Sequence, residues 1–244
     1  MPKTKREPQP VRETASDAGH GRPLWTPAEL IALLGKEYGR VPQQPSGAPV
    51  TELVLTLLSQ HTSDHNSGQA MHRLLERFPS WPAVIEAPTA EVEEAIRPGG
   101  LAPTKAPRLQ ALLAEVAARR PDFDLGQLAE MPLDQAKAWL RSLPGVGPKT
   151  AACVLLFALG RPALPVDTHV ERVAKRLGLV PPKAPAERAH DLLEQTLAPH
   201  EVYAFHVDLI QHGRRTCHAR APQCPRCPLI ERCPRVGLPP LDGQ

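Results

Sequence analysis

The main pattern along the chain is the recurrence of apolar residues three and four positions apart, which is the spacing of an amphipathic helix. It appears first over residues 26–38, with Thr26 as the expected N-cap and Pro27 at the first helical position. The strict alternation typical of strands is rare, so the predicted fold class is all-α. The same spacing predicts further helices over residues 51–60, 67–78, 81–87, 89–96, 105–119, 125–130, 133–141, 150–159, 168–177, 186–197 and 201–213.

Composition adds one distinct segment to this picture. Residues 1–24 contain almost nothing that could be buried and lack the apolar stretch of a signal peptide. We expect a disordered, mostly basic tail there, a cytoplasmic protein, and no membrane partner. The net charge of +3 is too small to indicate a nucleic-acid partner by itself, so the local distribution of charge matters more.

A glycine-rich turn at residues 143–150, Leu-Pro-Gly-Val-Gly-Pro-Lys-Thr, joins two of the predicted helices. Gly145 and Gly147 permit the backbone conformations of a tight hairpin, and Pro148 suits the first position of the second helix. The backbone amides of Gly145, Val146 and Gly147 would then lie at a positive helix end that suits a DNA phosphate. The simpler interpretation is an ordinary hairpin between two helices.

Lys149 directly follows this turn, and Asp167 lies eighteen residues further on, in Pro-Val-Asp-Thr-His-Val. A lysine amine can attack the C1′ atom of a nucleotide, displace the base and form a Schiff base that permits β-elimination. A carboxylate can stabilise the positive charge that develops on the sugar. The alternative is that Lys149 is a solvated residue at a helix start and Asp167 a helix N-cap; Asp167 could fill both roles.

Four of the five cysteines, Cys217, Cys224, Cys227 and Cys233, are spaced C-x6-C-x2-C-x5-C. Without a secretory signal this pattern predicts a metal site rather than disulfides, and the spacing alone leaves zinc and an iron–sulfur cluster open. Arginines are interleaved with these cysteines, and we expect Arg215 and Arg220 to contact phosphates. The alternative is a structural site with incidental arginines.

LPGVGPKTA, VDTHV and the HGRRTC segment with its three later cysteines occur together in the order and spacing of the endonuclease III family, which the chain resembles from about residue 25 to residue 233. The resemblance implies a helix-hairpin-helix DNA glycosylase with AP-lyase activity. It implies a six-helix barrel over residues 46–161, with the hairpin at about 133–159, and a second domain over residues 25–45 and 162–244 that holds a [4Fe–4S] cluster on the four cysteines.

The resemblance also assigns roles and a substrate. Lys149 matches the family's Schiff-base nucleophile and Asp167 its catalytic aspartate, whereas the similar mismatch-specific adenine glycosylases lack this lysine. The implied partner is double-stranded DNA with damaged bases, chiefly oxidised pyrimidines, or with abasic sites. The damaged nucleotide would be flipped into a pocket by a monomeric enzyme associated with a bacterial nucleoid.

Two segments depart from the family pattern. The family usually has a glutamine that fills the gap left by the flipped base, and here His61 aligns with it, next to Gln60. The second wedge residue is retained as Leu101, but Ala102 and Pro103 replace the usual tyrosine and asparagine. The motifs therefore predict the type of reaction, whereas these two departures leave open which damaged bases are substrates.

Two other functions compete with this assignment. The first is a glycosylase of the same fold that acts on alkylated or mismatched bases, an alternative that the altered wedge segments leave open. The second is a non-catalytic DNA-binding relative that uses the hairpin and the cysteine-rich segment only to hold phosphates. Lys149 argues against most relatives of the first kind, and borohydride trapping on abasic DNA would separate the second from an enzyme.

The arginines near the cysteines lead to a prediction about salt dependence. Replacing Arg215 or Arg220 by alanine should lower the slope of log affinity against log salt concentration by roughly one, because one phosphate contact is lost. Fluorescence anisotropy of a labelled duplex over a salt series measures this slope. An unchanged slope in both variants would exclude these arginines from the DNA footprint.

Overall fold

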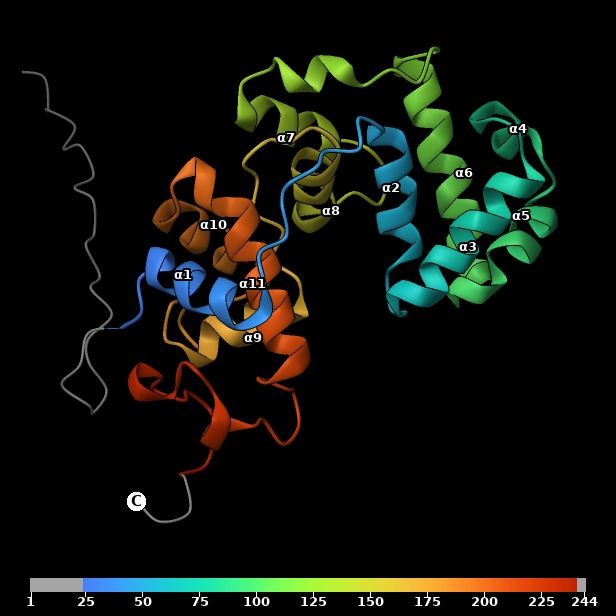
Figure 1. Cartoon of the computed structure of the whole chain (residues 1–244). Coiled ribbons are helices and arrows are strands. Elements are labelled where there is room, and N and C mark those ends of the chain that lie inside the picture. Colours follow the sequence, from blue (N-terminus) through green and yellow to red (C-terminus); the bar gives the residue numbers. More distant parts are fainter. Residues whose placement is uncertain (1–23, 241–244) are drawn as a thin grey trace, which may run out of the picture.

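The computed structural model describes residues 24–240, and within this range every regular element is helical (Figure 1). The all-α prediction is confirmed. The tail predicted over residues 1–24 lies outside the described residues, apart from Leu24. Among the described helices, none has the length and apolar character needed to cross a membrane.

Seven helices surround one apolar core, here called the barrel core, whose buried members extend from Val50 to Ala163. Its fully buried leucines include Leu53, Leu74 and Leu109, and each such side chain contributes about 1.5–3 kcal/mol by leaving water. The helices are α2 (Pro49–Leu58), α3 (Asp64–Arg77), α4 (Trp81–Glu86), α5 (Thr89–Ile96), α6 (Ala102–Arg119), α7 (Leu133–Arg141) and α8 (Pro148–Cys153).

Four helices enclose a second apolar core, here called the terminal core: α1 (Pro27–Tyr38), α9 (Thr168–Arg176), α10 (Ala186–Thr196) and α11 (Val202–Arg215). The two ends of the described chain meet there. The indole N–H of Trp25 donates to the carbonyl oxygen of Leu229 over 3.1 Å. The guanidinium of Arg232 lies 3.6 Å from the centroid of the Trp25 ring and pairs with Glu29 at 2.7 Å.

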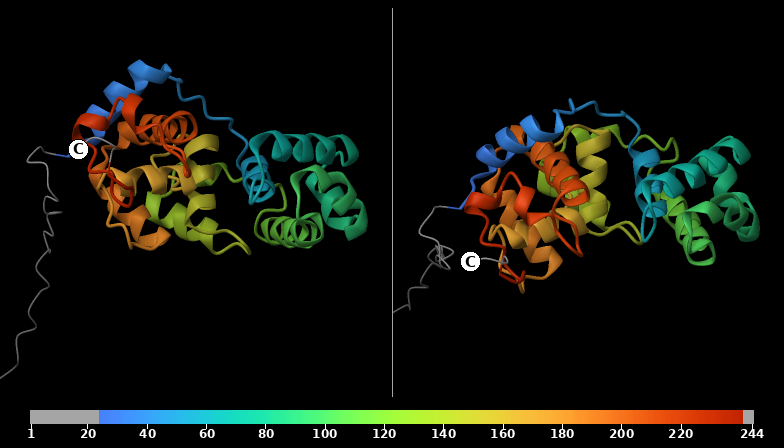
Figure 2. Two further views of the ribbon diagram at one scale, coloured as in Figure 1. Left: turned by 90° about the horizontal axis from the view of Figure 1, so that it is seen from below. Right: turned by 60° about the horizontal axis from the view of Figure 1, so that its bottom comes forward.

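The chain passes from one core to the other after α1, along the blue segment in Figure 2, and returns after α8. The second passage is a π-helical turn, Val154–Ala158, in which Leu155 belongs to the barrel core and Leu156 to the terminal core. The amides of Ser46 and Gly47, in the first passage, donate to carbonyls of this turn over 3.0 Å each. The two passages are therefore bonded to each other. The domain boundaries after residues 45 and 161 remain a prediction.

Several predicted helix ends were wrong. α6 begins at Ala102 rather than at residue 105, because Pro103 fits the first turn, where a missing N–H costs nothing. The predicted helix 125–130 is only a 3₁₀ turn, Gly126–Ala129, which follows a bond from the Gly126 N–H to the Asp124 carboxylate at 2.7 Å. The predicted helix 150–159 begins at Pro148 and widens into the π-helical turn, where contacts with two cores override regular α geometry.

Candidate catalytic and cluster sites

The hairpin turn between α7 and α8 is built from backbone conformations that its glycines allow. Gly145 has a φ of +76°, in the left-handed region that favours glycine. Val146 points inward, is 7% exposed, and donates its N–H to the carbonyl of Leu143 over 3.2 Å. Gly147 is the N-cap of α8 and carries no side chain that could satisfy the first amides of that helix. Because Val146 is buried, it can contact DNA only through its backbone.

The end of α6 holds the hairpin in place. Arg119, in the last turn of α6, donates to the hydroxyl of Ser142 over 2.6 Å and to its carbonyl over 3.3 Å. Ser142 is the C-cap of α7, directly before the turn. The same guanidinium lies 5.5 Å from the centroid of the Trp139 ring. These contacts satisfy carbonyl and hydroxyl groups at the helix end, and they fix where the turn begins.

Lys149 and Asp167 both stand at helix starts, on elements of different cores. Lys149 is the second residue of α8 and is partly exposed. Asp167 is the N-cap of α9, and its Oδ1 atom accepts hydrogen bonds from the amides of His169 at 2.9 Å and Val170 at 2.8 Å. The structure records no hydrogen bond to Oδ2 within residues 24–240, so capping occupies only one oxygen of this carboxylate.

Two buried side chains lie within electrostatic reach of both residues. Burial raises the pKa of the Cys153 thiol to about 12, while the Lys149 charge lowers this pKa and the Asp167 charge raises it. Burial lowers the pKa of His206 to about 4, opposed by the nearby Asp167 carboxylate and assisted by Lys149. His206 is 3% exposed, and its Nδ1 lies 2.8 Å from the Pro165 carbonyl. The charges of Lys149 and Asp167 thus both act on the same neutral thiol and imidazole.

The sequence pattern gave no indication of Glu52, a carboxylate near this pair. Glu52 lies in the first turn of α2, which packs against α8. Burial raises its pKa, opposed by a hydrogen bond from the Thr56 hydroxyl at 3.3 Å and by the positive charge of Lys149. An acidic residue in a first helical turn is usually explained by the helix dipole, so its position gave no reason to single it out.

The predicted wedge residues lie on two loops with similar backbone geometry. His61 has a φ of +54° and is exposed, and Gln60 beside it is partly exposed. Leu101 has a φ of +53° and is 55% exposed, an unusual position for a large apolar side chain. Left-handed conformations are costly for residues other than glycine and are held only where the surrounding structure requires them.

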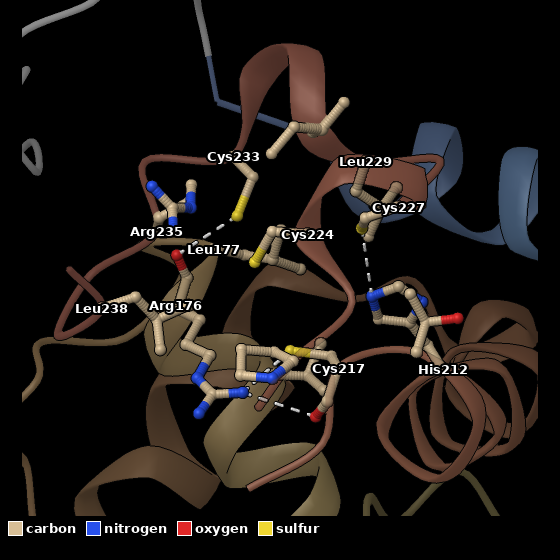
Figure 3. A pocket seen from close by; sticks show the side chains of 14 residues that line it. Arg176, Leu177, His212, Cys217, Cys224, Cys227, Leu229, Cys233, Arg235 and Leu238 are labelled. Atoms are coloured by element: carbon tan, nitrogen blue, oxygen red, sulfur yellow. Dashed lines mark hydrogen bonds between the residues drawn. The ribbon is translucent and has the colours of Figure 1, made fainter. Parts of the chain in front are cut away.

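The four predicted cysteine ligands line one pocket between α9, α11 and the C-terminal segment (Figure 3). The pocket has about 370 Å³ of empty space, part of it open to solvent. None of these cysteines forms a disulfide. Arg176 donates to the Cys217 sulfur over 3.2 Å, the Cys233 thiol donates to the Arg176 carbonyl over 3.6 Å, and His212 lies 3.7 Å from the Cys227 sulfur.

The donor set of this pocket fits a sulfur-ligated group of several atoms. Burial raises the pKa of Cys227 to about 12 and that of Cys233 to about 11, so both remain thiols unless a cation neutralises them. Within residues 24–240, no three His, Cys, Asp or Glu side chains are grouped closely enough to hold a single metal ion. The four sulfurs line one pocket, and such a set of thiols is the kind that holds zinc or an iron–sulfur cluster.

The arginines near this pocket differ in their surroundings. Arg215 is exposed and lies 5.3 Å from the centroid of the Tyr38 ring, and Arg220 is exposed on the loop that follows Cys217. Arg214, another arginine of this segment, pairs with Asp64 of α3 at 2.7 Å. This ion pair joins the end of α11 to the start of α3, directly after the His61 loop.

Comparison with known proteins agrees with this arrangement. A family model described as HhH-GPD superfamily base excision DNA repair protein matches residues 54–199. Endonuclease III of a Synechocystis species is 34% identical over 208 residues, which is 84% of this chain and 90% of that protein. Endonuclease III of Treponema pallidum is 39% identical over 183 residues, or 75% of this chain and 82% of that protein.

The structural comparison extends the likeness to the arrangement of the helices. A trapped endonuclease III–DNA covalent intermediate, an estranged-adenine complex, superposes with a TM-score of 0.73 and 30% identity. The match covers 86% of this chain and 96% of that one. The chain belongs to the helix-hairpin-helix superfamily of base excision DNA repair proteins and, within it, to the endonuclease III family.

Proposed function

We propose that this protein is a bifunctional DNA glycosylase and AP lyase, with Lys149 as nucleophile and Asp167 as the carboxylate that stabilises the cationic sugar. The observation that supports the proposal is that the charges of these two residues, from α8 and α9, both act on the buried side chains of Cys153 and His206. A trapped covalent intermediate of a homologous endonuclease III supports the lyase chemistry.

In this reaction the Lys149 nitrogen forms a bond to C1′ while the bond between C1′ and the base breaks, and the electron pair leaves with the base. The nitrogen then gives up one proton, and the C1′–O4′ bond of the sugar ring breaks with its electron pair on O4′, which takes up a proton, so that a protonated imine forms. Loss of a proton from C2′ then expels the 3′ phosphate by β-elimination. The carboxylate of Asp167 faces the positive charge that develops on the sugar. Its Oδ2 carries out this role while Oδ1 continues to cap α9.

The hairpin and the two loops would hold DNA around this centre. The amides of Gly145 and Gly147 would bind one phosphate, which fixes the register without reading the sequence, whereas the predicted Val146 amide already donates to the Leu143 carbonyl. His61, with Gln60 beside it, and Leu101 are exposed on their loops and would fill the gap that a flipped nucleotide leaves. The proposed substrates are oxidised pyrimidines in double-stranded DNA, together with abasic sites.

One observation is compatible with a second substrate class, alkylated or mismatched bases. His61, Ala102 and Pro103 occupy wedge positions where the family usually has other residues. A panel of duplexes that each contain a single oxidised, alkylated or mismatched base distinguishes the two classes. Preferential excision of oxidised pyrimidines is the expected result, and preference for an alkylated or mismatched base would favour the alternative.

We propose that Cys217, Cys224, Cys227 and Cys233 hold a [4Fe–4S] cluster. Such a cluster would supply four sulfur–iron bonds that tie the C-terminal loop, with Arg220, to α11. The chain is proposed to act as a monomer in the bacterial cytoplasm, at the nucleoid where its DNA substrate lies.

The nucleophile assignment predicts that Lys149→Ala abolishes the adduct that borohydride traps on abasic DNA, because no amine remains to form the imine. DNA affinity should be largely retained, since the hairpin amides are unchanged. Denaturing gel electrophoresis and anisotropy measure the two properties. Lys183→Ala, which removes an exposed lysine elsewhere, is the control and should trap normally. Wild-type trapping by Lys149→Ala would place the nucleophile elsewhere.

The carboxylate assignment predicts that Asp167→Asn slows base excision by roughly 10²–10³-fold, the usual loss for one electrostatic contact in the transition state. Cleavage at a preformed abasic site should suffer less, because less charge then develops on the sugar. Asparagine is as good an N-cap as aspartate, so the melting temperature should change little. Single-turnover kinetics on both substrates give the two rates; unchanged excision would leave Asp167 as a helix cap only.

The cluster assignment predicts about four iron and four sulfide per chain after anaerobic purification. Cys224→Ser should lose most of this iron, because one ligand of the pocket is removed. Cys153→Ser is the matched control, since Cys153 lies in the barrel helices and should not affect the iron content. Elemental analysis measures the iron, zinc and sulfide content per chain. Stoichiometric zinc without iron would contradict the assignment.

A further inference from the structure

Lys105, in the first turn of α6, is a buried amine that the proposed chemistry does not use. It is 3% exposed, and burial lowers its pKa. None of the ion pairs within residues 24–240 involves it. Its Nζ instead donates to two backbone carbonyls, that of Leu58 at 2.7 Å and that of Gly99 at 2.8 Å. Burying an amine is costly, so these two contacts require an explanation.

The two carbonyls lie at the bases of the two wedge loops. Leu58 is the last residue of α2, three positions before His61. Gly99 ends the 3₁₀ turn Arg97–Gly99 (η1), two positions before Leu101. Carbonyls at helix ends have no partner within the helix, and one ammonium group satisfies both of these. Lys105 therefore joins two segments that are 47 and 6 residues away from it in sequence.

Two further observations show that this junction is tight. A Cβ atom on Gly99 would lie 3.1 Å from the Cβ of Ala70 and 3.7 Å from the Leu58 carbonyl oxygen, so only glycine fits there without displacement of its neighbours. The backbone N–H of Lys105 also donates to the Leu101 carbonyl over 2.9 Å. This bond holds in place Leu101, the residue with the left-handed conformation. The side chain of Lys105 thus bonds to the bases of both loops, and its backbone bonds to the Leu101 loop.

We propose that Lys105 is a positioning residue for base excision, which holds the His61 loop and the Leu101 loop at a fixed separation so that both enter the DNA stack together. The proposal rests on the proposed glycosylase function. Two wedges that move independently would fill the gap at different depths, and the flipped state would be less populated. Lys105 acts through the two loops and does not touch the substrate.

The test compares Lys105→Met with Gln110→Met, a matched control on the same helix. Gln110 also donates to buried carbonyls, those of Val84 at 3.0 Å and Ala87 at 2.8 Å, but these belong to the end of α4 rather than to a wedge loop. Lys105→Met loses hydrogen bonds from an ammonium group to carbonyls at helix ends, and Gln110→Met loses hydrogen bonds from an amide group to such carbonyls. Both substitutions should therefore lower the melting temperature. Only Lys105→Met removes the link between the wedges.

Two rates are measured under single turnover, at a temperature where both variants are folded. They are excision from a duplex with one thymine glycol and cleavage of a duplex with a preformed abasic site. Lys105→Met should slow excision by up to about 100-fold, the loss typical of misplaced groups. Cleavage at the abasic site should change much less, because no base has to be unstacked. Gln110→Met should leave the ratio of the two rates at the wild-type value.

A second measurement does not depend on activity. Amide hydrogen exchange in the free protein should become faster in residues 59–63 and 99–103 together in Lys105→Met, and in neither segment in Gln110→Met. If Lys105→Met fails to fold, Lys105→Gln replaces it, because the shorter side chain keeps a polar donor but withdraws it from the Leu58 and Gly99 carbonyls. It should reproduce both the changed rate ratio and the faster exchange.

The possible failures are distinguishable. A wild-type protein that excises nothing and forms no adduct would overturn the proposed function, and the exchange data would still test the link between the loops. An active wild type with an unchanged rate ratio in Lys105→Met, or with exchange altered in one loop only, would overturn the role of Lys105. A ratio shifted equally in Gln110→Met would reduce the effect to general destabilisation.

Discussion

The structure depends on one constraint, the sharing of a single helical segment by two separate apolar cores. The chain that begins as α8 ends in a π-helical turn in which Leu155 packs into the barrel core and Leu156 into the terminal core. Lys149 therefore takes its position from the barrel, whereas Asp167 takes its position from α9 and the terminal core. The relative position of the two residues therefore depends on the segment that both cores share, and the bonds from Ser46 and Gly47 strengthen that segment.

Local signals in the sequence were enough to predict much of this arrangement. The all-α class follows from apolar spacing, and the hairpin, the cap at Asp167 and the four cysteines are each contained in a short motif. Lys105 and Glu52 escaped notice for a common physical reason. Each lies in an ordinary-looking first turn of a helix, and its significance comes from groups brought near it by the fold, such as the Leu58 carbonyl and the Lys149 charge. The π-helical turn was missed because only tertiary packing distinguishes it from the α-helix before it.

Helices of the terminal core also supply polar neighbours to the cysteine pocket. His212 on α11 lies between the Cys227 sulfur and the hydroxyl of Tyr38 on α1, 2.8 Å from the latter. The same hydroxyl lies 2.8 Å from the Thr216 hydroxyl, one residue before Cys217. Burial lowers the pKa of His212 to about 4, so near neutral pH its imidazole is neutral and adds no charge beside the sulfurs.

The meeting of Trp25 with Leu229 has a consequence for the order in which the molecule is made. The barrel core uses only residues between Val50 and Ala163, so it can fold while the ribosome is still adding the rest of the chain. The terminal core requires Leu30 from the start of the chain together with Leu229 from near its end. A nascent chain would thus carry a formed hairpin with Lys149 well before α9 is packed and Asp167 is in place. The N-cap of α9 therefore reaches its final position only after the segment that contains Leu229 has been made, so the barrel precedes the terminal core in the order of folding.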